Sequence, residues 1–267
     1  MFISAKDNPK IKAYCKLASS KRARAEQGAF VVEGVINCLD IIRTENIEIT
    51  SLFYTEEALE KHRGELPVEV FEGFDEKRRF VITSEVARKM SQVEQASGAF
   101  VIARRLDIPF SAEALDPGGK YLVLDNIQDP GNLGTMIRTS AAVGIDGIIL
   151  TANTVDLYNP KVVRSAMASM PLVKLFIEND YPAVIGTLND LGIRTYAAVV
   201  RDGEPVTDID WSEGCAVVIG NEGRGLPESD ALLCSHRVTI HMKGSIDSLN
   251  AAVASSILLW EMSGRGK

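Results

Sequence analysis

Five polar residues in the second half of the chain could together bind and activate a polar substrate: Asn132, Arg138, Glu222, Ser248 and Asn250. The Arg138 guanidinium could hold a phosphate group through two parallel hydrogen bonds. Glu222 follows a run of apolar residues, in a loop where its carboxylate could fix a partner. Ser and Asn also cap helices, however, and glycines also make simple turns. Residue type and spacing alone leave both a catalytic and a structural interpretation open.

Two glycine-bearing loops accompany these residues. Residues 129–134 read DPGNLG and stand between an expected strand and an expected helix, where backbone N–H groups and the helix dipole can bind an anion. Residues 220–225 read GNEGRG. Neither loop has the G-x-G-x-x-G spacing of dinucleotide folds, and no Lys-Ser/Thr pair follows the glycines as in a P-loop. Each loop could therefore bind a phosphate in another way, or it could be a simple turn.

Short apolar runs alternate with helical patterns around these loops. Residues 215–219 are five apolar residues without alternation, which is typical of a strand buried on both faces of a parallel sheet. Further strands are expected at residues 121–125, 147–150, 172–177, 195–200 and 238–240. Helices are expected at residues 135–143, 162–167, 184–191 and 249–262. Ligands of open α/β sheets lie at the carboxyl ends of the strands, so residues 220–226 and 242–250 are the expected site.

The first hundred residues predict a smaller α/β domain. Strands are expected at residues 29–32, 49–54 and 99–103, with an extended segment at 68–71. Helices are expected at residues 8–18, 35–42, 56–62 and 84–90. Residues 106–120 contain two prolines and a Gly-Gly pair without a clear period, which indicates a linker. The predicted organisation is therefore a first domain at 1–105, a linker at 106–120 and a second domain at 121–267.

The charge of the chain is unevenly distributed. The net charge is −7, but residues 1–24 hold seven Lys and Arg against one Asp, a balance of +6, which leaves −13 for the rest. A solvated helix surface would account for this basic arm, and so would binding of phosphates. The basic residues concerned are Lys10, Lys12, Lys16, Lys21, Arg22 and Arg24.

The remaining composition is that of an ordinary globular protein, with 46% apolar and 24% charged residues. No apolar run approaches the length of a membrane span, and the first residues lack the apolar core of a signal peptide, so a cytoplasmic protein is expected. Four scattered cysteines without a C-x-x-C pair predict free thiols, and three scattered histidines give no metal site.

Three segments, taken together and in order, resemble the signature motifs of the SpoU (TrmH-type) RNA ribose 2'-O-methyltransferases of the SPOUT superfamily. They are LDNIQDPGNLGTMIRTSAAVGIDGIIL, VVIGNEGRGLP and VTIHMKGSIDSLNAAVASSILLWE, and the resemblance covers about residues 121–262. The segments NPKIKAYCKLASSKRAR and FVVEG are similar to the substrate-binding domain often fused ahead of this catalytic domain, a fold related to a family of large-subunit ribosomal proteins.

This resemblance implies a trefoil-knotted α/β fold, a homodimer, and methyl transfer from S-adenosylmethionine to a ribose 2'-hydroxyl of structured RNA, ribosomal RNA ahead of transfer RNA. It implies that backbone groups of Gly220, Ile240, Met242 and Leu249 hold the cofactor. Arg138 is then expected to clamp a phosphate and stabilise oxyanion charge, because Arg stays protonated. Asn132 and Glu222 would fix the Arg and the ribose, and Ser248 and Asn250 match the polar pair of the third motif.

One residue departs from the family pattern, and two other functions remain open. His241 stands where the family usually has proline, which could alter the pocket wall.

An RNA-binding module with a decayed active site is one alternative function, and the intact polar residues argue against it. A dinucleotide-dependent oxidoreductase is the other, against which the missing G-x-G-x-x-G speaks. Under the leading interpretation, the six basic residues of the arm would contact RNA phosphates, which position a nucleic acid without reading its sequence.

Overall fold

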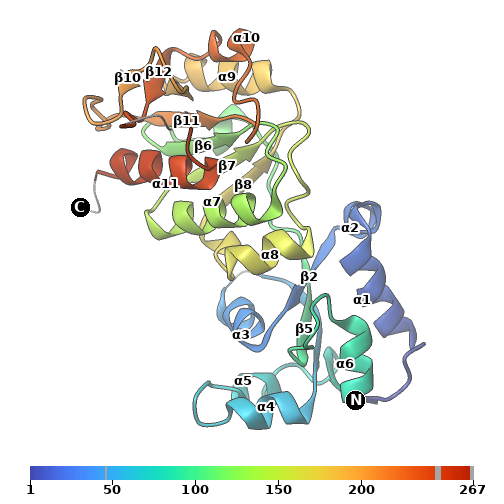
Figure 1. The fold of residues 1–267 in the computed structure, drawn as a ribbon. Coiled ribbons are helices and arrows are strands. Elements are labelled where there is room, and N and C mark those ends of the chain that lie inside the picture. Colours follow the sequence, from blue (N-terminus) through green and yellow to red (C-terminus); the bar gives the residue numbers. More distant parts are fainter. Residues whose placement is uncertain (46, 244–247, 265–267) are drawn as a thin grey trace. The chain divides into compact units, whose positions relative to one another are not determined.

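The computed structural model describes residues 1–45, 47–243 and 248–264, which fold into two compact units (Figure 1). The first unit comprises residues 1–106 and 156–171. The second comprises residues 107–155 and 172–267. None of the described helices is long and apolar enough to cross a membrane.

The first unit is built on a mixed five-stranded sheet. Its strands lie in the order β1 (Phe2–Ile3), β4 (Arg79–Ile82), β3 (Ile49–Tyr54), β5 (Ala99–Arg104) and β2 (Ala29–Glu33). β5 runs antiparallel to both of its neighbours, and the other pairs are parallel. The helices are α1 (Pro9–Ser19), α2 (Lys21–Gln27), α3 (Val35–Arg43), α4 (Glu56–His62), α5 (Glu69–Glu72), α6 (Ser84–Met90) and α8 (Pro160–Ala166). Tyr14, Phe53, Phe80 and Phe100 fill one core, with Tyr14 edge-on to two of the rings.

The prediction of an extended segment at residues 68–71 is wrong, because these residues lead into and form the short helix α5. Val68 and Phe71 are both fully buried. Side chains three residues apart reach the same side only in a helical turn, whereas a strand would direct them to opposite faces. Over only four residues, which read Val-Glu-Val-Phe, the sequence pattern does not separate the two conformations.

The second unit contains a seven-stranded sheet in which every pair is parallel. The order is β10 (Glu204–Pro205), β12 (His236–Thr239), β9 (Arg194–Ala198), β11 (Cys215–Ile219), β6 (Lys120–Leu124), β7 (Gly147–Leu150) and β8 (Lys174–Ile177). Every residue of β7 and β11 is buried, as expected for strands covered on both faces. The α/β class with a parallel sheet is confirmed.

The α-helices among the described residues of this unit are α7 (Pro130–Ala142), α9 (Tyr181–Asp190), α10 (Glu228–Ala231) and α11 (Ala251–Met262). α7 and α11 pack against each other (Figure 1). Residues 107–119, expected as a linker, contribute to this unit. Ile108 bridges to Phe176, the Phe110 ring lies edge-on to Phe176, and Leu115 joins the core.

α7 begins earlier than the sequence pattern predicted, at Pro130 instead of residue 135. Asp129 is the N-cap, its side chain accepts a hydrogen bond from the backbone N–H of Asn132, and Pro130 occupies the first helical position. These two start signals outweigh the low helix propensity of Gly131 and Gly134. Most of the expected DPGNLG loop is therefore the first turn of a helix.

Candidate active site

The Glu222 carboxylate joins the loop that follows β11 to the start of α7. It accepts hydrogen bonds from the backbone N–H groups of Gln128 at 3.1 Å and Asp129 at 2.9 Å, and from Nδ2 of Asn132 at 3.2 Å. Burial by itself raises the pKa of Glu222, but the Asp129 and Gln128 N–H donors outweigh it and hold the pKa below its usual range. Glu222 is therefore a carboxylate at neutral pH and acts as an acceptor.

Asn132 links Glu222 to α11 through a further hydrogen bond. Its Oδ1 accepts a hydrogen bond from Nδ2 of Asn250 at 3.0 Å. The Oδ1 of Asn250 in turn accepts from the backbone N–H groups of Ala252 and Val253, so Asn250 caps α11. A residue from each of the three sequence motifs thus meets in one hydrogen-bonded row, which we call the Glu222–Asn132–Asn250 row.

The loop after β11 is shaped by two residues, of which sequence reasoning recognised one. Gly220 has no room for a side chain, since a Cβ would lie 2.4 Å from the backbone N of Leu226. Asn221, which was missed, donates from Nδ2 to the Asn126 carbonyl at 2.9 Å and accepts at Oδ1 from the N–H groups of Gly223 and Arg224. An Asn directly after a buried strand is a turn former, and that signal could have identified it.

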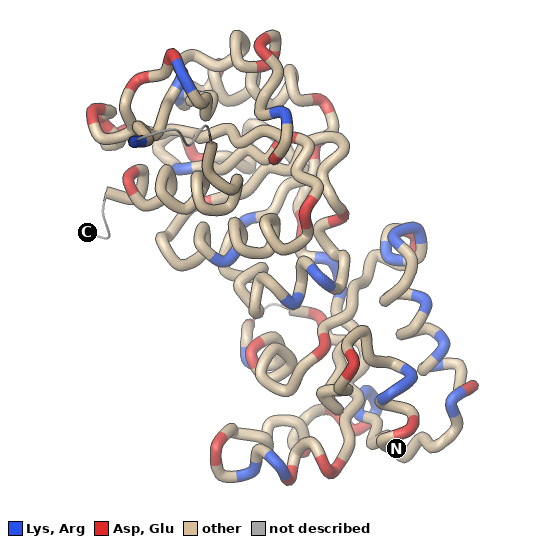
Figure 2. The backbone as a smooth tube through the Cα atoms, in the orientation of Figure 1, with Lys and Arg blue, Asp and Glu red and all other residues tan. Residues whose placement is uncertain are grey.

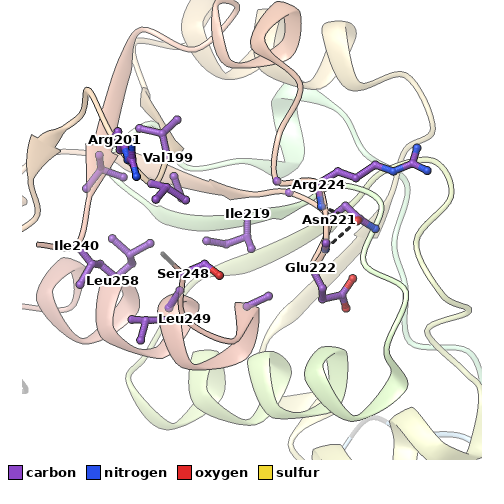
Figure 3. A pocket seen from close by; sticks show the side chains of 18 of the residues that line it. Val199, Arg201, Ile219, Asn221, Glu222, Arg224, Ile240, Ser248, Leu249 and Leu258 are labelled. Atoms are coloured by element: carbon purple, nitrogen blue, oxygen red, sulfur yellow. Dashed lines mark hydrogen bonds between the residues drawn. The ribbon is translucent and has the colours of Figure 1, made fainter. Parts of the chain in front are cut away.

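A cavity of about 580 Å³ opens beside this loop (Figure 3). Its apolar residues Ile240, Leu249 and Leu258 gather at one end, and Asn221 and Glu222 lie at the other. The four residues expected to hold a cofactor all line it, as does Ser248: they are Gly220, Ile240, Met242 and Leu249. Val199 and Arg201, in the segment after β9, also line the cavity and were missed, because nothing in the sequence shows that β9 neighbours β11.

The volume and lining of this cavity fit a nucleoside-sized cofactor. Small-molecule sites of several hundred Å³ are mostly apolar, with a few polar groups that fix orientation. Here apolar side chains are combined with the backbone of the glycine-bearing loop at residues 220–225. S-adenosylmethionine has an aromatic base, a ribose and a charged amino-acid end, so its chemistry matches this lining. Residues 244–247 of the third motif lie outside the described residues.

Two predicted residues stand apart from this arrangement. Arg138 lies on α7 with an exposed side chain, and the described residues that line the cavity do not include it. His241 is exposed; its neighbours Ile240 and Met242 line the cavity, but His241 itself is not among the described lining residues.

The basic arm forms α1 and α2 of the first unit, where Lys and Arg recur along the chain (Figure 2). Five of its six predicted RNA-contacting residues are exposed: Lys10, Lys12, Lys16, Lys21 and Arg22. Lys10 stands over the Phe80 ring at 4.6 Å, and Arg22 forms an exposed ion pair with Glu26.

Arg24 differs from the rest of the arm, because it is 5% exposed. Its Nε donates to Asp156 at 2.8 Å, and its Nη1 donates to the Leu17 carbonyl at 2.6 Å. A guanidinium held in this way stabilises the first unit and is not available to RNA. The sequence pattern could not distinguish it from its neighbours, since Asp156 is far away along the chain.

Comparison with known proteins agrees with this geometry. Residues 119–260 match the SpoU rRNA Methylase family. The chain belongs to this family. Residues 8–101 match the MRM3-like substrate binding domain, which coincides with most of the first unit of this SpoU family member.

Several proteins are similar to this one over nearly the whole length of the chain. The 23S rRNA (guanosine(2553)-2'-O)-methyltransferase RlmP of Bacillus subtilis is 28% identical over 98% of this chain and 99% of its own length. An uncharacterised tRNA/rRNA methyltransferase of Synechocystis is 30% identical over 97% of this chain and 92% of its own. The crystal structure of an AdoMet-bound rRNA methyltransferase from Sinorhizobium meliloti is 27% identical, covers 98% of this chain and 97% of its own, and superposes with a TM-score of 0.83.

Proposed function

We propose that this SpoU family member transfers a methyl group from S-adenosylmethionine to a ribose 2'-hydroxyl of structured RNA, ribosomal RNA ahead of transfer RNA. The observation that carries the proposal is the Glu222–Asn132–Asn250 row beside a cavity of about 580 Å³. The row unites all three motifs at the carboxyl end of β11, where an open parallel sheet offers a ligand site. The relatives named above support ribosomal RNA as the substrate.

The cofactor supplies an electrophilic methyl group on a sulfonium centre, so the protein has to orient the RNA hydroxyl and accommodate its lost proton. Gly220, Ile240, Met242 and Leu249 would hold the cofactor through their backbone groups. Arg138 would clamp a neighbouring phosphate and stabilise negative charge that develops on the 2'-oxygen. Glu222 and Asn132 would fix the ribose, and Ser248 and Asn250 would complete the polar wall.

The two family matches support one role for each domain. The first domain, residues 1–105, would bind RNA, and residues 121–267 would carry the methyltransferase, with 106–120 between them. The exposed basic residues of α1 and α2 would contact phosphates: Lys10, Lys12, Lys16, Lys21 and Arg22. Such contacts provide affinity and register but no sequence information, so the choice of nucleotide would come from other contacts.

The active form would be a homodimer in the cytoplasm. A groove of about 520 Å³ runs along α7 and α11, and its apolar residues include Val253 and Trp260, each 49% exposed. Asn132 and Asn250 line the same groove. A second subunit on this surface would cover the exposed apolar side chains and would reach the Glu222–Asn132–Asn250 row.

A trefoil knot would account for the way the cavity is built. Its described lining comes from segments that are distant in the sequence, at residues 198–201, 219–225, 238–242 and 248–258. A chain that threads one of these segments through a loop formed by another would bring them all around one cofactor. Knots are rare, and this one would rigidify the backbone groups that hold the cofactor.

The reaction and its substrate can be tested together by mapping ribose 2'-O-methylation across total RNA with and without the gene. We expect one or a few sites, in ribosomal RNA, to lose the modification. A methylation map without any change would contradict the proposed reaction.

A further inference from the structure

A second cavity, of about 830 Å³, lies in the first unit and has no part in the proposed methyl transfer. All the residues that line it belong to this unit. It opens where β2 and β3 end and where the chain approaches β5. Gly34 and Gly98 line it at positive φ angles of 114° and 74°, a conformation that favours glycine, so bare backbone forms part of its wall.

Three of the described residues that line this cavity are cations. Lys61 and Arg88 line it with exposed side chains, and Arg164 of α8 lines it half-buried. The carboxylates that line it are Glu57 and Glu94, and Glu57 already accepts a hydrogen bond from Ser84 Oγ at 3.0 Å. Three cations against two carboxylates give a positive local balance in a chain whose net charge is −7. This balance favours a ligand with negative charge.

Two large apolar side chains stand beside these cations. Ile36 is 52% exposed and Met167 is 45% exposed, and both line the cavity. Met167 and the next residue, Ala168, also hold positive φ angles of 46° and 59°, which is uncommon for residues with a side chain. An adaptable Met and an Ile next to cations can hold a ligand that combines an apolar ring with a phosphate, as a nucleotide does.

Helix α6 both lines the cavity and contacts α1 of the basic arm. Arg88 of α6 lines the cavity, and the adjacent Lys89 donates from Nζ to the Lys6 carbonyl at 2.8 Å. The Lys89 carbonyl is also contacted by the Cys15 thiol of α1. An RNA strand that follows the exposed lysines of α1 therefore meets the cavity after crossing one helix. This adjacency favours RNA over a protein as the occupant.

We propose that this cavity receives an unpaired nucleotide of the RNA substrate, with the base against Ile36 and Met167 and the flanking phosphates near Lys61, Arg88 and Arg164. RNA-binding domains commonly recognise bases that are splayed out of a helix. The inference rests on the proposed function, because it takes RNA as the substrate. It assigns to the first unit a nucleotide-binding site in addition to the phosphate contacts of the arm.

The first test measures RNA binding by the full-length variant Lys61→Glu/Arg88→Glu, in which both exchanged side chains are exposed. The probe is unmodified large-subunit ribosomal RNA transcribed in vitro, titrated at several salt concentrations. We expect binding to weaken roughly tenfold, and the slope of log affinity against log salt to fall by about one for each cation removed. The control, Lys77→Glu, reverses an exposed lysine of the same unit outside the cavity and should bind as the wild type does. It is compared with the single variant Lys61→Glu, which makes the same change of charge and should bind more weakly.

The second test uses ultraviolet cross-linking of the wild-type protein to the same RNA, followed by mass spectrometry of the peptides. Nucleotides should be found on peptides that contain Ile36 or Met167, and Ile36→Ser should reduce them. Equal affinity of the Lys61→Glu variant and the Lys77→Glu control, the result expected of a protein-binding cavity, would overturn the proposal. Cross-links confined to α1 and α2 would overturn it as well. Both readouts need no turnover, so a failure of methylation would count against the proposed reaction and leave this test intact.

Discussion

The amide nitrogen of Asn250 lies 3.0 Å from Oδ1 of Asn132, which joins the first residue before α11 to the first turn of α7. Because Asn132 also donates to Glu222, a change at any of the three residues alters the orientation of the others. The Glu222–Asn132–Asn250 row therefore allows sharp tests, in which stability, cofactor binding and turnover can be separated.

Removing the charge of Glu222 should impair turnover more than folding. In Glu222→Gln, one carboxylate oxygen is replaced by an NH2 group, which donates and cannot accept. The side chain therefore meets the Gln128 and Asp129 N–H groups and Asn132 with one neutral acceptor instead of two charged ones. We expect the methylation rate to fall on the order of 10²-fold, as for other preorganised polar groups. S-adenosylmethionine binding, measured by calorimetry, should change only a few-fold. Glu213→Gln, an exposed carboxylate in the same unit, is the control.

The same carboxylate should contribute to the pH dependence of stability. The folded-state pKa of Glu222 is lowered, so its ionised form stabilises the protein above the unfolded pKa of about 4.3. That contribution is lost as pH falls through the folded pKa. Between about pH 5 and 3, the melting temperature of Glu222→Gln should therefore decline less steeply than that of the wild type. Parallel curves for the two proteins would contradict the assigned hydrogen bonds.

Asn250 combines two tasks that substitutions can separate. Asn250→Ala removes the N-cap of α11 and should lower the free energy of unfolding by about 1 kcal/mol in urea titrations. Asn250→Ser keeps a capping oxygen but has no amide to reach Asn132. We expect the Ser variant to recover most of the stability and none of the lost methylation rate. Full recovery of both would mean that Asn250 acts only as a cap.

Arg138→Ala should lower the methylation rate by about 10²- to 10³-fold through loss of oxyanion stabilisation. S-adenosylmethionine should still bind, because the described residues of the cavity do not include Arg138. Single-turnover measurements with saturating RNA separate the chemical step from binding. Lys174→Ala, which removes an exposed cation of the same unit, serves as control. A wild-type rate in Arg138→Ala would remove this residue from the mechanism.

Trp260→Glu places a charge in the groove along α7 and α11, which should prevent dimerisation because a buried unpaired charge is costly. Analytical ultracentrifugation at micromolar concentration should show a dimer for the wild type and a monomer for the variant. Leu232→Glu changes an equally apolar, 67% exposed side chain that follows α10 and should remain dimeric. Dimers in both variants would place the interface elsewhere.

The sequence predicted best those elements whose signals are local. Residues 215–219 and 147–150 match β11 and β7, because these apolar runs are as short as strands and rich in β-branched residues. The helices at residues 56–62 and 84–90 match α4 and α6, which begin after Thr caps. The four residues 68–71, Val-Glu-Val-Phe, fit both the strand period and the helix period. Gly131 and Gly134 have low helix propensity, so the first turn of α7 was not predicted.

Contacts between distant segments could not be read from local patterns. Asn221 binds the Asn126 carbonyl, and Arg24 binds Asp156, across separations that only the folded chain closes. The order of strands is equally non-local, which is why Val199 and Arg201 were missed in the cavity. The motif resemblance supplied what periodicity could not, since it predicted that residues near 132, 222 and 250 would meet.

The segment 156–171 has a consequence for how this protein is made. The first unit takes α8 and Asp156 from the stretch between β7 and β8, so it lacks the partner of the buried Arg24 until that stretch has been synthesised. At ordinary rates of translation, several seconds separate the emergence of residue 106 from that of residue 171. During this interval, the Arg24 guanidinium of the nascent chain would lack its carboxylate partner, Asp156. A fragment that ends near residue 106 would preserve that state permanently, so truncation at the apparent domain border should yield an unstable first unit.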